Sequence, residues 1–168
     1  MNTSHELIKK VRNGNAVKRW HTRRMLTNDT VGEHTANVLA IVLAINPNPT
    51  LELIKAAVIH DTAEQWTGDI PATAKWMSPK LKSACDELEV KMLLANGFEI
   101  PTLTSFEQLV LKWADMLDLL YRCLDEIRLG NRSMVAVFKN GVNYLENYEP
   151  NYKGKALLNE LIEEFKYV

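Results

Sequence analysis

The sequence lacks several features that would identify other classes of protein. It has two cysteines in 168 residues, Cys85 and Cys123, which are too few for a disulfide scaffold and lack the spacing of a zinc or redox motif. Its formal net charge is -1, so no global positive field attracts a nucleic-acid polymer or an anionic membrane. We therefore expect Cys85 and Cys123 to be ordinary packed thiols. Because the net charge is near zero, an anionic ligand has to be held by local groups.

The sequence also has no apolar run long enough to cross a membrane. The longest, Val38–Ile45, falls far short of the roughly 20 residues that a transmembrane helix needs. Residues 1–20 lack the basic start and apolar stretch of a signal peptide, so a cytoplasmic location is expected. With 46% hydrophobic and 24% charged residues, the chain is expected to form one globular domain over residues 1–168.

The hydrophobic pattern is helical throughout, with capping residues at the starts of helices and Gly or Pro at their ends. Residues 14–30 are expected to be irregular, and residues 67–71 to form a loop. The expected fold is all-α, a single bundle of about seven or eight helices. The helices are expected after Thr3, over 30–45, from Leu51 to about Glu64, over 79–96, from Ser105 to about Gly130, over 133–147 and over 154–167.

Four polar residues stand on helices that otherwise look core-facing: His34, His60, Asp61 and Asp115. A buried imidazole or carboxylate is unfavourable unless it is paired, and a divalent cation satisfies two of each at once. For any one of these residues, a satisfied core group is the more frequent alternative. Sequence spacing by itself does not establish that three separate helices converge.

The order H...HD...D resembles that of the HD-domain phosphohydrolases. The match extends over roughly residues 15–131, is most specific in the HDxxExxTGDxP stretch that begins at His60, and is weak in the last two helices. It is closest to the bacterial HD-domain 5'-deoxynucleotidases (YfbR-like) and the related phage dATP phosphohydrolases. The residues that carry it are Arg19-Trp20, Glu33-His34, His60-Asp61-Thr62-Ala63-Glu64, Thr67-Gly68-Asp69-Ile70-Pro71, Lys75, Arg122-Cys123-Leu124-Asp125-Glu126 and Gly130-Asn131.

This resemblance implies an HD-domain bundle with one divalent metal ion, held by His34, His60, Asp61 and Asp115. Such a ligand set suits Mn, Co, Fe, Ni or Zn, whereas Mg usually prefers all-oxygen sites, so the identity of the metal stays open. The expected partner is a deoxynucleotide substrate, with no nucleic-acid polymer and no membrane. The family also suggests a homodimer or a higher homo-oligomer.

Two carboxylates are expected at the reaction centre. Glu64 lies three residues after Asp61 and would share its face on a continuing helix, and in the family its position acts as general acid or base. The alternative for Glu64 is a solvated carboxylate at a helix end. Asp69 lies in the glycine-containing loop, where a capping role competes with the family role beside the reaction centre.

Arg19, Trp20 and Lys75 are the expected contacts to the substrate. Arg19 can clamp phosphate oxygens and stabilise developing charge, and Lys75 can add a point charge. For both, the alternative is a solvated surface cation. The family places Trp20 against the sugar, where its ring would clash with a ribose 2'-hydroxyl; the alternative is an ordinary packing aromatic.

The resemblance thus implies an enzyme that removes the 5'-phosphate from 2'-deoxynucleoside 5'-phosphates. A deoxynucleoside triphosphate hydrolase, similar to the phage dATP phosphohydrolases, is the alternative among enzymes. A nucleotide-binding regulator without turnover is the alternative outside enzymes, and the presence of all four metal ligands and of Glu64 argues against it. Base preference, physiological metal, oligomeric state and cellular or phage origin stay open.

Overall fold

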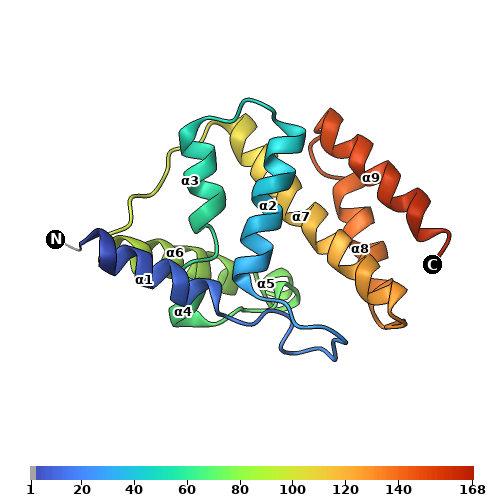
Figure 1. Cartoon of the computed structure of the whole chain (residues 1–168), viewed down its shortest axis with the longest axis horizontal. Coiled ribbons are helices and arrows are strands. Elements are labelled where there is room, and N and C mark those ends of the chain that lie inside the picture. Colours follow the sequence, from blue (N-terminus) through green and yellow to red (C-terminus); the bar gives the residue numbers. More distant parts are fainter. Residues whose placement is uncertain (1–2) are drawn as a thin grey trace. The chain divides into compact units, whose positions relative to one another are not determined.

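The computed structural model describes residues 3–168, which form nine helices and no β-strand (Figure 1). An isolated antiparallel bridge joins Lys18 and Thr30. The predicted all-α class is confirmed, and none of the helices in residues 3–168 is long and apolar enough to span a bilayer. The helices are α1 (Ser4–Asn15), α2 (Val31–Ile45), α3 (Leu51–Ile59), α4 (Glu64–Thr67), α5 (Ala72–Met77), α6 (Pro79–Ala95), α7 (Ser105–Arg128), α8 (Met134–Glu146) and α9 (Tyr152–Phe165).

The chain divides into two compact units. The first contains the residues up to Arg24, Asn28–Ala36 and Val58–Thr102; the second contains Met25–Thr27, Asn37–Ala57 and Leu103–Val168. In the first unit, α5 packs on α6 and α4 contacts both α1 and α6. In the second, α7 packs against α8 and α9 (Figure 1). A single domain over residues 1–168 stays a prediction.

Most helix boundaries lie where their capping residues predict them. Thr3 and Glu6 form a complete capping box at α1. At α2, the Thr30 N–H donates to Glu33 Oε2 at 3.1 Å, and the Glu33 N–H donates to Thr30 Oγ1 at 3.3 Å. Ser78 caps α6, with a proline at the first helical position. The side chains therefore satisfy backbone donors that the first turn leaves without partners.

Three details differ from the prediction. The expected helix from Leu51 to about Glu64 ends at Ile59, because short i to i-3 hydrogen bonds (Thr62 N–H to Ile59 O, 2.9 Å) turn the chain before α4 begins. The short helix α5 was not expected. The helix expected from Ser105 has its capping box one residue earlier than a Ser105–Gln108 pair would place it, at Thr104 with Glu107, because a carboxylate accepts backbone N–H bonds better than an amide does.

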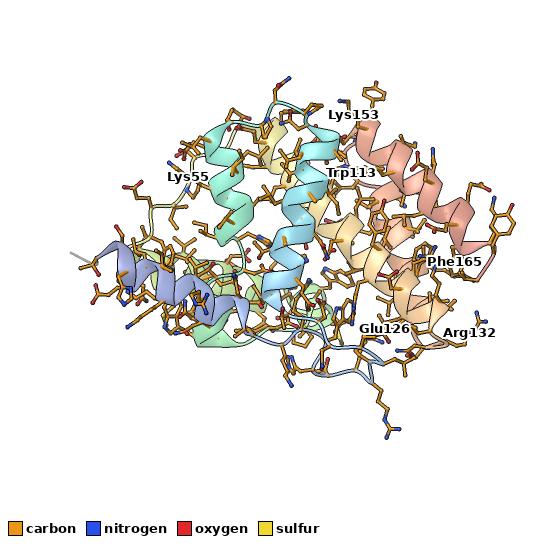
Figure 2. All side chains as sticks on the ribbon, in the orientation of Figure 1. Lys55, Trp113, Glu126, Arg132, Lys153 and Phe165 are labelled. Carbon is orange, nitrogen blue, oxygen red and sulfur yellow. The ribbon has the colours of Figure 1, made fainter. Side chains whose placement is uncertain are left out.

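A close approach of α9 to α7 depends on one glycine. An added Cβ at Gly154 would lie 2.6 Å from a ring carbon of Trp113, a fully buried residue of α7 that Figure 2 labels. The Trp113 indole cannot move away easily, because its Nε1–H donates to the carbonyl of Glu149 at 2.8 Å. Phe138 and Phe165 stack at 4.5 Å between centroids and extend this core.

A buried carboxylate, Glu126, organises another part of the second unit. It accepts the N–H of Leu26 at 2.8 Å, the N–H of Thr27 at 2.9 Å and the side-chain amide of Asn131 at 2.8 Å. Burial alone raises the pKa of Glu126, but the hydrogen bonds from Asn131 and from these backbone groups outweigh it and lower the pKa to about 2. Glu126 is thus ionised and fully satisfied in the folded chain.

Glu126→Gln should lower the free energy of unfolding at pH 7 by about 3 kcal/mol, because two backbone donors and Asn131 lose a charged acceptor. A carboxyl with a lowered pKa stabilises the fold above its unfolded value of 4.5, and this contribution disappears as the pH falls toward about 2. Urea unfolding from pH 7 to pH 3 measures both effects. Asp125→Asn, at the exposed neighbouring position, is the control, and an equal effect of both variants would contradict the prediction.

Candidate active site

Three of the predicted metal ligands, His34, His60 and Asp61, lie together in the first unit. The Nε2 atoms of the two histidines are 3.1 Å apart, and each is 3.4 Å from Asp61 Oδ2. Ligand atoms about 2.0–2.2 Å from one ion, at ordinary coordination angles, stand roughly 3.0–3.5 Å from one another. The triangle therefore fits a divalent cation. His34 is fully buried and Asp61 is 24% exposed, which leaves one side open for a ligand.

Asp115, the fourth predicted ligand, belongs to α7 and to the second unit. Its Oδ2 accepts a hydrogen bond from Lys112 Nζ, one helical turn earlier, at 2.9 Å. This ion pair raises the pKa of the Lys112 ammonium, against the effect of its burial. The role of Asp115 as a ligand stays a prediction.

The turn after α3 positions His60 and Asp61. Its tight course is possible because Gly14, in the last turn of α1, has no side chain: an added Cβ would lie 3.1 Å from the Thr62 carbonyl oxygen and 3.2 Å from its Cα. Helix α4 then begins at Glu64, two residues after Thr62. Glu64 therefore follows Asp61 across a turn, and the continuing helix expected between them is absent from residues 60–63.

Glu64 is nevertheless a buried group beside this site. Its side chain is removed from solvent, and in the part of the chain that the structure describes Oε2 has no hydrogen-bond partner. Burial, followed by the negative charges of Asp61 and Asp69, raises the pKa of Glu64 to about 9, while the charges of Arg19 and Lys75 oppose that rise. Without a cation, Glu64 holds a proton at neutral pH. A solvated helix-end carboxylate, the alternative interpretation, is excluded by its burial.

Arg19, Trp20 and Asp69 also lie together. Trp20 has a φ of +60°, a left-handed conformation that is unfavourable by about 1–2 kcal/mol for a residue with a side chain. Its N–H donates to Asp69 Oδ2 at 3.2 Å, which helps to hold this conformation. Asp69 therefore accepts from a neighbouring loop instead of capping a helix, and His21 Nδ1 lies 3.9 Å from the same carboxylate oxygen.

Lys75, on α5, pairs with Glu89 on α6 at 3.1 Å, and both side chains are partly buried. Burial lowers the pKa of Lys75, but Glu89, together with Glu64 and Asp61, raises it above its ordinary value. Lys75 is thus a charged group of the site and not a freely solvated cation.

Sequence reasoning missed two acidic residues, Glu89 and Asp29, which contact Lys75 and the Arg19-Trp20 pair respectively. Asp29 stands in Asn28-Asp29-Thr30, which looks like a turn, and Glu89 looks like part of a solvated helix face. Only tertiary contacts distinguish them from such residues.

Known proteins resemble this chain in both sequence and fold. A 5'-deoxynucleotidase of Photobacterium profundum is 25% identical over 175 residues, which cover 90% of this chain and 89% of that protein. An HD-domain phosphohydrolase from Listeria innocua has a TM-score of 0.79 at 20% identity, covering 98% of this chain and 90% of that one. The HD phosphohydrolase DatZ of cyanophage S-2L, solved with dA and one catalytic zinc ion, has a TM-score of 0.67 at 15% identity, covering 100% of this chain and 99% of that one.

The chain also matches the model of a protein family over most of its length. The model of the YfbR-like 5'-deoxynucleotidases matches residues 6–165, which include every residue of the candidate site and both of the last two helices. The structural neighbours show the HD-domain fold. The resemblance inferred from the HDxxExxTGDxP stretch is confirmed, and this chain belongs to the YfbR-like 5'-deoxynucleotidase family.

Proposed function

We propose that the site around Glu64 removes the 5'-phosphate from 2'-deoxynucleoside 5'-monophosphates and releases a deoxynucleoside and phosphate. Family membership makes the chain a phosphohydrolase, and the relative from P. profundum bears the name 5'-deoxynucleotidase. One observation carries the assignment to these residues: Glu64, a buried carboxyl group whose Oε2 has no hydrogen-bond partner within residues 3–168, lies in the field of two carboxylates and two cations beside the triangle of His34, His60 and Asp61.

His34, His60 and Asp61, with Asp115 from α7, would hold one divalent cation. When bound, such an ion polarises a phosphoryl oxygen and lowers the pKa of water. The two imidazoles favour Co, Mn, Zn, Fe or Ni over Mg. The zinc ion in the cyanophage structure supports zinc as one candidate.

The chain's own residues supply the remaining steps. Arg19 and Lys75 bind the phosphate oxygens and offset the charge that develops as the P–O5' bond breaks. The oxygen of water bonds to phosphorus, and the leaving 5'-oxygen takes a proton. Glu64 is the group proposed to exchange a proton with the attacking water or the leaving oxygen. Asp69 anchors the backbone of Trp20, whose ring is proposed to meet C2' of the sugar.

A homodimer or higher homo-oligomer is part of the proposal, as is a cytoplasmic location. Hydrolysis of deoxynucleoside triphosphates is the alternative that the substrate panel below tests.

Divalent Mn, Co or Zn should raise the melting temperature of the chelator-treated protein, because a ligand that binds the folded state stabilises it by about 2.7 kcal/mol at a hundredfold excess over Kd. For a chain of this size that corresponds to roughly 5–10 °C. Asp61→Ala should lose both this shift and activity, whereas His5→Ala, an exposed residue of α1, should keep both. An undiminished shift in Asp61→Ala would argue against the site.

Glu64→Gln should lower kcat by about a hundredfold or more, because an amide cannot exchange the proton. The metal-dependent rise in melting temperature should remain, since Glu64 is not proposed as a ligand. Glu87→Gln, an exposed position on α6, serves as the control and should keep full activity. Loss of the metal response in Glu64→Gln would reassign Glu64 as a metal ligand.

Glu64→Gln should also change how the stability of the protein depends on pH when a chelator has removed divalent metals. A carboxyl whose pKa rises from 4.5 to about 9 on folding opposes folding increasingly as the pH rises from 4.5 toward 9. Glu64→Gln has no such group, so metal-free wild type should lose stability relative to Glu64→Gln over this range. Melting temperatures measured at several pH values check this, and parallel curves for the two proteins would contradict it.

Trp20 should select deoxyribose, so dAMP should be hydrolysed far faster than AMP. A clash with a ribose 2'-hydroxyl discriminates by a few kcal/mol, whereas a merely apolar pocket discriminates weakly. Trp20→Ala should gain activity on AMP while it keeps part of its activity on dAMP. Phosphate release from dAMP, AMP, dATP and ATP measures this. Equal rates of the unmutated enzyme on dAMP and AMP would contradict the selection of deoxyribose by Trp20. A preference for dATP over dAMP would favour the alternative, hydrolysis of deoxynucleoside triphosphates.

A further inference from the structure

Trp20 has a backbone conformation that surrounding groups have to hold. Its φ of +60° lies in the left-handed region, which residues with a side chain rarely adopt. The hydrogen bond from the Trp20 N–H to Asp69 Oδ2 fixes the backbone. It does not fix the indole ring, which needs a contact of its own.

Asp29 supplies that contact. Its Oδ2 accepts the Nε1–H of Trp20 at 3.0 Å, and the same oxygen lies 3.8 Å from Nη1 of Arg19. One carboxylate thus contacts both the ring proposed to meet the sugar and the guanidinium proposed to bind the phosphate. The Asp29 side chain is 7% exposed, so water competes little for these contacts.

The backbone around Asp29 is itself held in place. The carbonyl of Asp29 accepts the N–H of Arg19 at 3.1 Å, and the antiparallel bridge between Lys18 and Thr30 flanks this bond. Thr30 then opens α2 through its capping box with Glu33. The carboxylate therefore projects from a supported position toward both partners.

We infer that Asp29 is a positioning residue for sugar selection, because its carboxylate orients the Trp20 indole and the Arg19 guanidinium relative to each other. The ring can then exclude a 2'-hydroxyl while the guanidinium holds the 5'-phosphate of the same nucleotide. This inference rests on the proposed function for the role of Trp20. Asp29 acts through its two neighbours and takes no part in the chemical step.

Asp29→Ala removes both contacts, and the ratio of kcat/KM for dAMP to that for AMP should fall about tenfold or more. Asp29→Asn should lower the ratio less, because its amide oxygen can still accept the indole N–H. Asp29→Glu keeps the carboxylate and should recover part of the selectivity. Asp86→Asn makes the same chemical change at an exposed site on α6 that pairs with Lys82, and its ratio should equal that of the wild type.

A Trp20→Phe background separates this role from a merely structural one. Phenylalanine keeps a ring but has no N–H to donate, so Asp29→Ala should lower the ratio much less in Trp20→Phe than in the wild type. An equal fall in both backgrounds overturns the inference. An unchanged ratio in folded Asp29→Ala, or in Asp29→Asn if the alanine variant does not fold, also overturns it.

The indole N–H resonances of the protein report on positioning without any activity. The chain has four tryptophans, and loss of one signal in Trp20→Phe assigns that of Trp20. Asp29→Ala should shift this signal and speed its exchange with solvent, and an unmoved signal overturns the inference. If the unmutated enzyme hydrolyses dAMP and AMP equally, the proposed role of Trp20 fails and selectivity by Asp29 with it. The indole signal then shows separately whether Asp29 holds the ring.

Discussion

Burial of ionisable groups in the first unit is the constraint on which the candidate site depends. Asp61, Glu64 and Asp69 place three carboxyl groups in one electrostatic neighbourhood, against the two cations Arg19 and Lys75. Without a metal the excess negative charge is relieved by a proton on Glu64. A divalent cation held by His34, His60 and Asp61 would reverse this balance of charge. Metal binding would then favour both an ionised Glu64 and an anionic phosphate beside it, so that metal, proton and substrate are linked through one local charge.

The proposed site separates two kinds of recognition. Phosphate would be recognised by charge, through Arg19 and Lys75, each of which has an acidic neighbour that limits its freedom. Sugar recognition would instead rely on shape, through the ring of Trp20, and shape selects only if the ring cannot move aside. The Trp20 backbone N–H and indole N–H both donate to carboxylates, of Asp69 and Asp29 respectively, and these two bonds would keep the ring in place.

The sequence predicts the helical class and most helix starts because capping is a local interaction between residues three positions apart. It fails between Ile59 and Glu64, where a turn replaces a continuous helix, since the tight approach of Gly14 to Thr62 is a tertiary contact. The resemblance to the family's motif pointed to His34, His60 and Glu64 as candidate site residues. Asp29 and Glu89 have ordinary sequence surroundings, and their significance comes from partners that only folding brings near.

The capping box at Thr30 constrains the length of the segment between Asp29 and His34. Asp29 precedes the box and His34 lies in the first turn of the helix that it starts, so one short segment carries both Asp29 and His34, a proposed metal ligand. Helical geometry fixes the rotation and rise per residue. A residue inserted or deleted between Asp29 and His34 would turn the His34 imidazole by roughly 100° about the helix axis relative to Asp29. The length of this stretch is therefore constrained by the residues at its two ends.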